Sequence, residues 1–290
     1  MKRILRALLQ AAEQRAAAKY VVGPELQDAI RACHTLETEG YGSTMCFWNG
    51  DRDTGRNVAD HYCAAVEAIR LDGLNSCISV KSAPLHFSYE LFHDVCQRAA
   101  QGEIEVRFDS LWLETADQTF DLLRRLRQSC KALGCTLPGR WRRSLADADW
   151  AVESQLIVRV VKGQWADPDV QSRDPSAGFL AVIDRLAGHA RRVAVATHDP
   201  ILAREALGRL NAAGTSAELE LLFGLPMRKV IPVAKALGNP VRIYVPYGHA
   251  WLPYLIWQAR QNPRVVWRVM CDMIASTLTA SADRLPRQVP

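Results

Sequence analysis

The stretch Leu156-Ile157-Val158-Arg159-Val160-Val161-Lys162-Gly163 is apolar, rich in β-branched residues and closed by a glycine. Such a run, without strict alternation of polar and apolar residues, predicts a strand buried on both faces, as in a parallel sheet. Similar runs recur along the chain. The expected strands cover residues 43–47, 77–80, 105–108, 134–137, 156–161, 193–196, 217–221 and 241–245.

Longer helical patterns separate most of these runs, at residues 60–71, 88–100, 116–133, 178–190, 200–212 and 226–237. A doubly wound sheet would show the same alternation, but eight strands favour an α/β fold of the TIM-like (β/α)8 barrel type. The expected organisation has a helical N-terminal arm (1–40), the barrel (41–276) and a polar C-terminal tail (277–290). A helix over residues 251–260 would lie across the barrel mouth.

The composition of the chain argues against some classes of function. The chain has 290 residues and a formal charge of +5, and this mild, scattered excess of cations argues against a nucleic-acid groove. The eight cysteines form no C-x-x-C pair and no zinc-finger spacing, which indicates reduced thiols in the cytoplasm and no metal ligands. The N-terminus lacks the apolar core of a signal peptide and predicts an amphipathic helix instead.

In a barrel, chemistry lies where the strands end. Lys81 and Asp109 come at two such ends, and Arg159 and Lys162 bracket a third. The two cations of the third end either pair with carboxylates such as Asp109 and Glu220 or bind a phosphate or a reduced, anionic cofactor ring. His198 closes another strand, and it is either a hydrogen-bonded structural residue or a cofactor contact.

Six motifs occur in an order that resembles the proline dehydrogenase family of the PutA type, FAD-dependent (β/α)8 enzymes that oxidise L-proline to pyrroline-5-carboxylate. The resemblance covers most of the chain. The motifs are Ile78-Ser79-Val80-Lys81, Arg107-Phe108-Asp109, Arg159-Val160-Val161-Lys162-Gly163, Ala196-Thr197-His198-Asp199, the run from Val241 to Gly248, and the final helix with Trp251, Pro253 and Tyr254.

The resemblance implies a flavoenzyme that transfers a hydride from the carbon next to a substrate amine to FAD, with a membrane quinone as electron acceptor. It implies Lys81, Asp109 and Arg159 as catalytic residues. Peripheral contact with the inner membrane through the N-terminal helix is one option, and packing of that helix on the barrel is the other. The implied FAD contacts are Arg159, Val161, Lys162, Gly163, Gln164, Ala196, Thr197, His198, Asp199 and Glu220.

The implied substrate pocket departs from the family. Trp257 and Gln258 stand where the family has an arginine pair that holds the proline carboxylate, and Pro138-Gly139-Arg140 replaces a flavin-contacting Gln-Ala-Tyr. Without the arginine pair, a larger, neutral or differently oriented amine fits the pocket better than free L-proline. The expected substrate is L-proline or a proline-like, modified amine. The alternatives are a non-redox barrel that acts as a binding or partner protein, and a lyase that uses Lys81. The expected pocket walls are Trp165, Leu222, Tyr244, Tyr254, Trp257 and Gln258.

Overall fold

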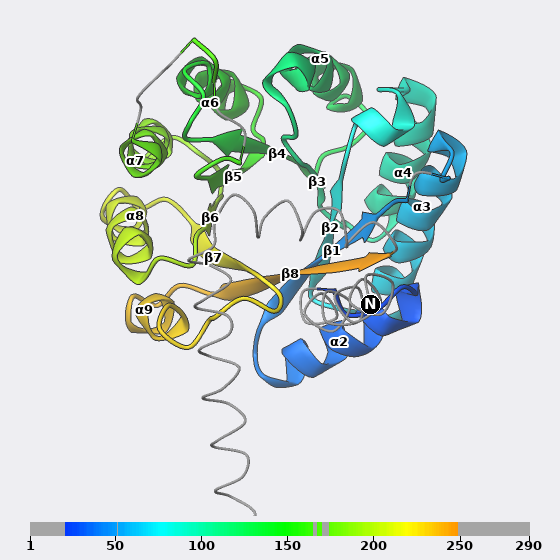
Figure 1. Ribbon diagram of the computed structural model, residues 1–290, viewed down its shortest axis with the longest axis horizontal. Coiled ribbons are helices and arrows are strands. Elements are labelled where there is room, and N and C mark those ends of the chain that lie inside the picture. Colours follow the sequence, from blue (N-terminus) through cyan, green and yellow to red (C-terminus); the bar gives the residue numbers. More distant parts are fainter. Residues whose placement is uncertain (1–20, 51, 165–166, 170–173, 249–290) are drawn as a thin grey trace, which may run out of the picture.

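The computed structural model describes residues 21–50, 52–164, 167–169 and 174–248. Its strands are all parallel and close into a barrel in which each strand pairs with the next and β8 pairs with β1 (Figure 1). The predicted (β/α)8 barrel is thus confirmed. The strands are β1 (Gly42–Trp48), β2 (Ser76–Val80), β3 (Val106–Phe108), β4 (Leu133–Pro138), β5 (Ile157–Val161), β6 (Val193–Ala196), β7 (Ala217–Leu222) and β8 (Val241–Gly248).

Helices surround the barrel (Figure 1). The helix α2 contacts β8 and β1 and lies in the outer ring between α9 and α3. The helices are α2 (Leu26–Thr38), α3 (Gly55–Asp72), α4 (Tyr89–Gln101), α5 (Ala116–Leu126), α6 (Ser144–Glu153), α7 (Pro175–Leu186), α8 (Pro200–Ala212) and α9 (Ile231–Ala236), with single 3-10 turns η1 (Ala83–Leu85) and η2 (Leu113–Thr115). No helix in these described ranges is long and apolar enough to cross a membrane.

The strands are buried on both faces, as predicted, but their side chains do alternate in character. In β5, Val158 and Val160 belong to the hydrophobic core, whereas Arg159 between them hydrogen-bonds Thr136 of β4 and reaches Glu220 of β7. Successive side chains of a strand point to opposite faces. The apolar set therefore packs against the helices, and a polar set fills the barrel interior. The expectation of strands without alternation was wrong, because buried cations and carboxylates satisfy one another inside the barrel.

Several helix ends differ from the sequence prediction. The helix expected over 116–133 ends at Leu126, since the chain turns back at 127–129 and Leu133 already belongs to β4. The helix expected over 226–237 begins only at Ile231, because Pro232 is tolerated only in the first turn. The helical stretches named from the sequence also omit α6, which is short and has little amphipathic pattern.

Candidate active site

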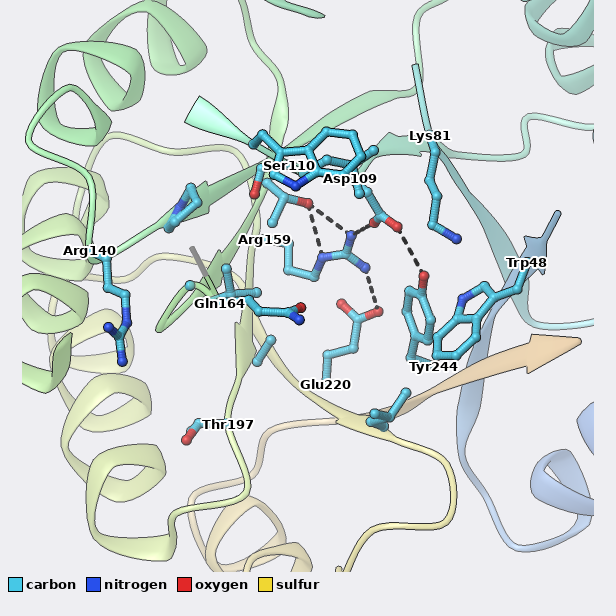
Figure 2. Close-up of a pocket in the computed structure, with 18 of the residues that line it drawn as sticks. Trp48, Lys81, Asp109, Ser110, Arg140, Arg159, Gln164, Thr197, Glu220 and Tyr244 are labelled. Carbon is cyan, nitrogen blue, oxygen red and sulfur yellow. Dashed lines mark hydrogen bonds and ion pairs between the residues drawn. The ribbon is translucent and has the colours of Figure 1, made fainter. Parts of the chain in front are cut away.

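A pocket of about 1010 Å³ opens at the carboxyl ends of the strands, the end at which barrel enzymes carry their catalytic groups. Polar side chains from opposite sides of the barrel converge on it (Figure 2). The site residues selected from the sequence that line this pocket are Lys81, Asp109, Arg159, Val161, Gly163, Gln164, Ala196, Thr197, His198, Glu220, Leu222 and Tyr244.

Arg159 lies in the middle of the pocket floor and is 4% exposed. Its Nε donates to Thr136 Oγ1 at 3.1 Å, its Nη1 donates to Glu220 Oε1 at 3.3 Å, and its Nη2 pairs with Asp109. Burial alone would lower the pKa of Arg159, but the carboxylates of Glu220 and Asp109 raise it above its usual value. The expected pairing with strand-end carboxylates is confirmed for Arg159, so its charge is balanced within the protein.

Asp109 is held in place by donors from three strands. It accepts hydrogen bonds from Ser79 of β2, from Arg159 of β5 and from Tyr244 of β8, whose Oη lies 3.0 Å from Oδ2. Burial, followed by the nearby Asp109 charge, raises the pKa of Tyr244 well above its usual value. The phenol therefore stays protonated and acts as a donor, and the carboxylate is fixed in position.

Lys81 is different, since it forms no ion pair with any described residue. Its Nζ lies 3.7 Å from Cys46 Sγ and 5.2 Å from the centroid of the Trp48 ring. Burial raises the pKa of Cys46, so the neighbouring sulfur is a neutral thiol rather than a counter-ion. The ammonium group is thus available to an anion that enters the pocket.

The opposite side of the pocket carries Arg140, which follows β4 (Figure 2). Its Nε is buried and has no hydrogen-bond partner among the described residues. Gly163 lines the same side with a φ of +90°, and a Cβ there would lie 2.8 Å from Pro138 Cβ. Only glycine combines this backbone conformation with this close approach.

His198 lines the pocket, but both of its ring nitrogens form hydrogen bonds with backbone groups. Nε2 accepts from the N–H of Leu222 at 2.9 Å, and Nδ1 donates to the carbonyl of Pro226 at 3.1 Å. This arrangement requires the neutral ring, and burial lowers the pKa of His198 in agreement with it. His198 therefore fastens the end of β6 to β7 and the following loop, and it can offer the pocket only its ring surface.

Two of the residues selected from the sequence lie outside the pocket lining. Lys162 pairs with Asp199 across 3.6 Å, and both side chains are more than one third exposed. Asp199 caps α8 by accepting from the N–H groups of Ile201 and Leu202. Burial alone would raise the pKa of Asp199, but these N–H groups and Lys162 lower it.

Known proteins resemble this chain over most of its length. Proline dehydrogenase 1 of Bacillus subtilis is 25% identical over 265 residues, which cover 85% of this chain and 87% of that protein. The proline dehydrogenase of Deinococcus radiodurans is 22% identical over 269 residues, 86% of each chain. No protein-family model matches the sequence. The chain is thus similar to bacterial proline dehydrogenases over most of its length.

Solved structures of proline utilization A share the fold of this chain. Proline utilization A from Bdellovibrio bacteriovorus, inactivated by N-propargylglycine, superposes with a TM-score of 0.77 at 14% identity over 89% of this chain. A Bradyrhizobium japonicum proline utilization A variant gives a TM-score of 0.70 at 20% identity over 84% of this chain. This chain spans about a third of the length of these two proteins, 34% and 30% respectively.

The residues that line the pocket fit a flavin dinucleotide. A volume of about 1010 Å³ is at the upper end of the roughly 300–1,000 Å³ of small-molecule sites, as a large cofactor requires. The unpartnered Nε of Arg140 offers a donor to an anionic group, and Gly163 keeps one wall free of a side chain.

Some of the predicted site residues lie outside the described part of the chain. They are Trp165, Tyr254, Trp257 and Gln258, and the helix expected over 251–260 and the tail expected over 277–290 lie outside it as well.

The structure adds lining residues that were not predicted from the sequence. Except for Thr136, which lies within β4, each ends or follows a strand, which was the available signal: Trp48, Arg140 and, after β3, Ser110, Leu111 and Trp112.

Proposed function

We propose that this protein is an FAD-dependent oxidoreductase that oxidises the C–N bond of L-proline or a proline-like, modified amine. One observation carries the proposal: one pocket holds a charge-balanced arginine cluster together with a lysine and an arginine that form no ion pair with the described residues (Figure 2). Such a pocket suits an amino acid beside a large anionic cofactor. The relatives named proline dehydrogenase support the same reading.

Lys81 would bind the carboxylate of the substrate. Its ammonium lies beside the Trp48 ring without a carboxylate partner among the described residues. An ammonium–carboxylate contact is a charge-assisted hydrogen bond, which contributes about 1.5–3 kcal/mol. Trp48 and Tyr244 would provide the flat walls against which a small ring packs.

Asp109 and Arg159 would orient the substrate. The Asp109 carboxylate accepts hydrogen bonds from Ser79, Arg159 and Tyr244, so its position is fixed and it acts as a hydrogen-bond acceptor rather than as a mobile base. Pre-organised charges of this kind need no rearrangement when charge develops during a reaction. The walls of the substrate pocket would be completed by Leu222, Trp165, Tyr254, Trp257 and Gln258.

FAD, when bound, would supply the acceptor for a hydride from the carbon next to the substrate nitrogen. Arg159 would place a fixed positive charge beside the ring, while the pocket residues near β5 and β6 would hold the cofactor. The pocket-lining residues proposed to hold FAD are Arg159, Val161, Gly163, Gln164, Ala196, Thr197, His198 and Glu220. Lys162 and Asp199, which lie outside the lining, complete the proposed set. A quinone would take the electrons onward, and the protein would act in the cytoplasm with peripheral contact at the inner membrane.

The test is the visible absorption spectrum of the purified protein, followed by anaerobic addition of L-proline. We expect a flavin spectrum that bleaches with L-proline or with a proline-like amine. A flavin spectrum that no such amine bleaches would contradict the substrate class. A colourless protein that takes up no added FAD would contradict the flavoenzyme and favour the binding-protein alternative.

The lyase alternative has one observation in its favour, which is that Lys81 forms no ion pair with Asp109. A lysine amine that is not held in an ion pair is free to attack a carbonyl carbon and form a Schiff base. Borohydride added together with a carbonyl substrate would then leave a covalent adduct on Lys81. An unmodified Lys81 peptide in mass spectra would exclude this chemistry.

A further inference from the structure

Arg140 differs from Arg159, the other arginine that lines the pocket. Arg159 is balanced by Asp109 and Glu220. Arg140 forms neither an ion pair nor a side-chain hydrogen bond with the described residues, although its Nε is buried. A buried N–H group without a partner is unfavourable unless a ligand satisfies it.

The backbone around Arg140 is fixed. The N–H of Arg140 donates to the carbonyl of Lys162 at 3.2 Å, and the N–H of Gly139 donates to the carbonyl of Val161 at 2.8 Å. A Cβ on Gly139 would lie 2.4 Å from the backbone nitrogen of Phe179, so the strand end is tightly packed against α7. Arg140 therefore begins from a rigid point beside the end of β5 and extends into the pocket (Figure 2).

Arg140 and Lys81 lie on opposite sides of the Arg159 cluster (Figure 2). A small amino acid bound at Lys81 would therefore leave Arg140 without a partner. A second anionic group is needed, and it must belong to a larger ligand in the same pocket. A guanidinium presents a planar fork of donors that matches the oxygens of a phosphate.

We propose that Arg140 binds the diphosphate of a dinucleotide cofactor. The inference rests on the proposed flavin dependence and assigns one contact of that cofactor to a residue particular to this chain. Arg140 would contribute to the affinity for phosphorylated ligands and not to the affinity for the flavin ring itself. This distinction makes the proposal testable by ligand choice.

The experiment compares FAD with riboflavin, which has the same ring and no phosphate. Cofactor-free protein would be titrated with each ligand, with quenching of flavin fluorescence as the readout. For Arg140→Gln we expect FAD to bind about 10- to 100-fold more weakly, the loss of one charge-assisted hydrogen bond, with riboflavin unchanged. Arg140→Lys keeps the charge but loses the fork, so it should fall between Arg140→Gln and the unaltered protein.

Arg142→Gln is the matched control. Arg142 lies two residues away, its side chain is 73% exposed, and it pairs only loosely with Asp169 at 3.8 Å. It should bind both ligands as the unaltered protein does. Thermal unfolding of all variants without ligand would show that each is folded, and Arg140→Lys keeps the comparison informative should Arg140→Gln not fold.

The outcomes separate this inference from the proposed function. Binding of FAD by Arg140→Gln within twofold of the unaltered protein, or equal weakening of FAD and riboflavin, would overturn the diphosphate contact and leave the flavoenzyme intact. Should the unaltered protein bind neither flavin, the proposed function fails, and inorganic pyrophosphate becomes the probe. A thermal shift with pyrophosphate that Arg140→Gln abolishes would then support the anion site, and its absence would overturn it.

Discussion

Cationic side chains are paired with carboxylates inside the barrel, whereas some of those at its mouth are not. Inside the barrel, Arg107 is fully buried and paired with Glu105, Glu218 and Glu220. Burial alone would raise the pKa of Glu218, but Arg242 and then Arg107 lower it to about 2. At the mouth, Lys81 and Arg140 have no carboxylate partners among the described residues. Counter-ions, and not residue type, separate a structural cation from one available to a ligand.

The largest effect is expected from Arg107→Met. This change leaves three buried carboxylates without their shared cation, and breaking a buried ion pair costs about 3–5 kcal/mol. Urea unfolding should show this loss, or the variant should fail to fold. Arg124→Met is the control, since Arg124 pairs with Asp121 at the surface and such pairs contribute at most about 1 kcal/mol. Equal losses for the two variants would remove the contrast between interior and surface pairs.

For Lys81→Met we expect a large loss of substrate binding and a small change in the free energy of unfolding. The loss of one charge-assisted hydrogen bond corresponds to about a 10- to 100-fold rise in the KM for an amino-acid substrate. Steady-state kinetics with L-proline, together with urea unfolding, would measure both quantities. A stability loss as large as that of Arg107→Met would show that Lys81 is a structural residue after all.

A pH effect is expected from His198. The pKa of this histidine is lowered by burial, so the folded protein binds fewer protons than the unfolded chain as pH falls below about 6.5. The free energy of unfolding should therefore decrease from pH 7 to pH 5, with at most about 2 kcal/mol from this residue. His198→Gln should flatten the decrease in urea midpoints over this range. An unchanged pH profile would show that His198 is not held in its neutral form.

The smallest effect is expected from Tyr244→Phe. It removes the hydrogen bond to Asp109, but Ser79 and Arg159 still hold the carboxylate, so the loss should be about 1 kcal/mol. Tyr247→Phe is the control, because the Tyr247 hydroxyl makes only a 3.4 Å contact with the carbonyl of His61. Thermal unfolding would compare them, and a larger loss for Tyr247→Phe would contradict the assigned role of Tyr244.

Much of the barrel mouth could be predicted from the sequence because it follows from where the strands end. Lys81, Asp109 and Thr197 come directly after apolar runs, and the structure brings all three to one pocket. Arg140 was named only within the departure Pro138-Gly139-Arg140 and not as a site residue, since the sequence does not show that its buried Nε lacks a partner among the described residues. The helix limits near 130 and 226 were missed since periodicity does not register a turn or a proline that must occupy a first helical turn.

The sequence by itself determined the order of strands and helices, since each is encoded by local periodicity and by residues that begin or end it. Only the tertiary structure decided which charges meet. Arg159 and Asp109 are 50 residues apart, Arg107 and Glu220 are 113 apart, and Tyr244 and Asp109 are 135 apart. Such pairs form because closure of the barrel brings the inward faces of distant strands together. The same closure left Lys81 and Arg140 without carboxylate partners among the described residues.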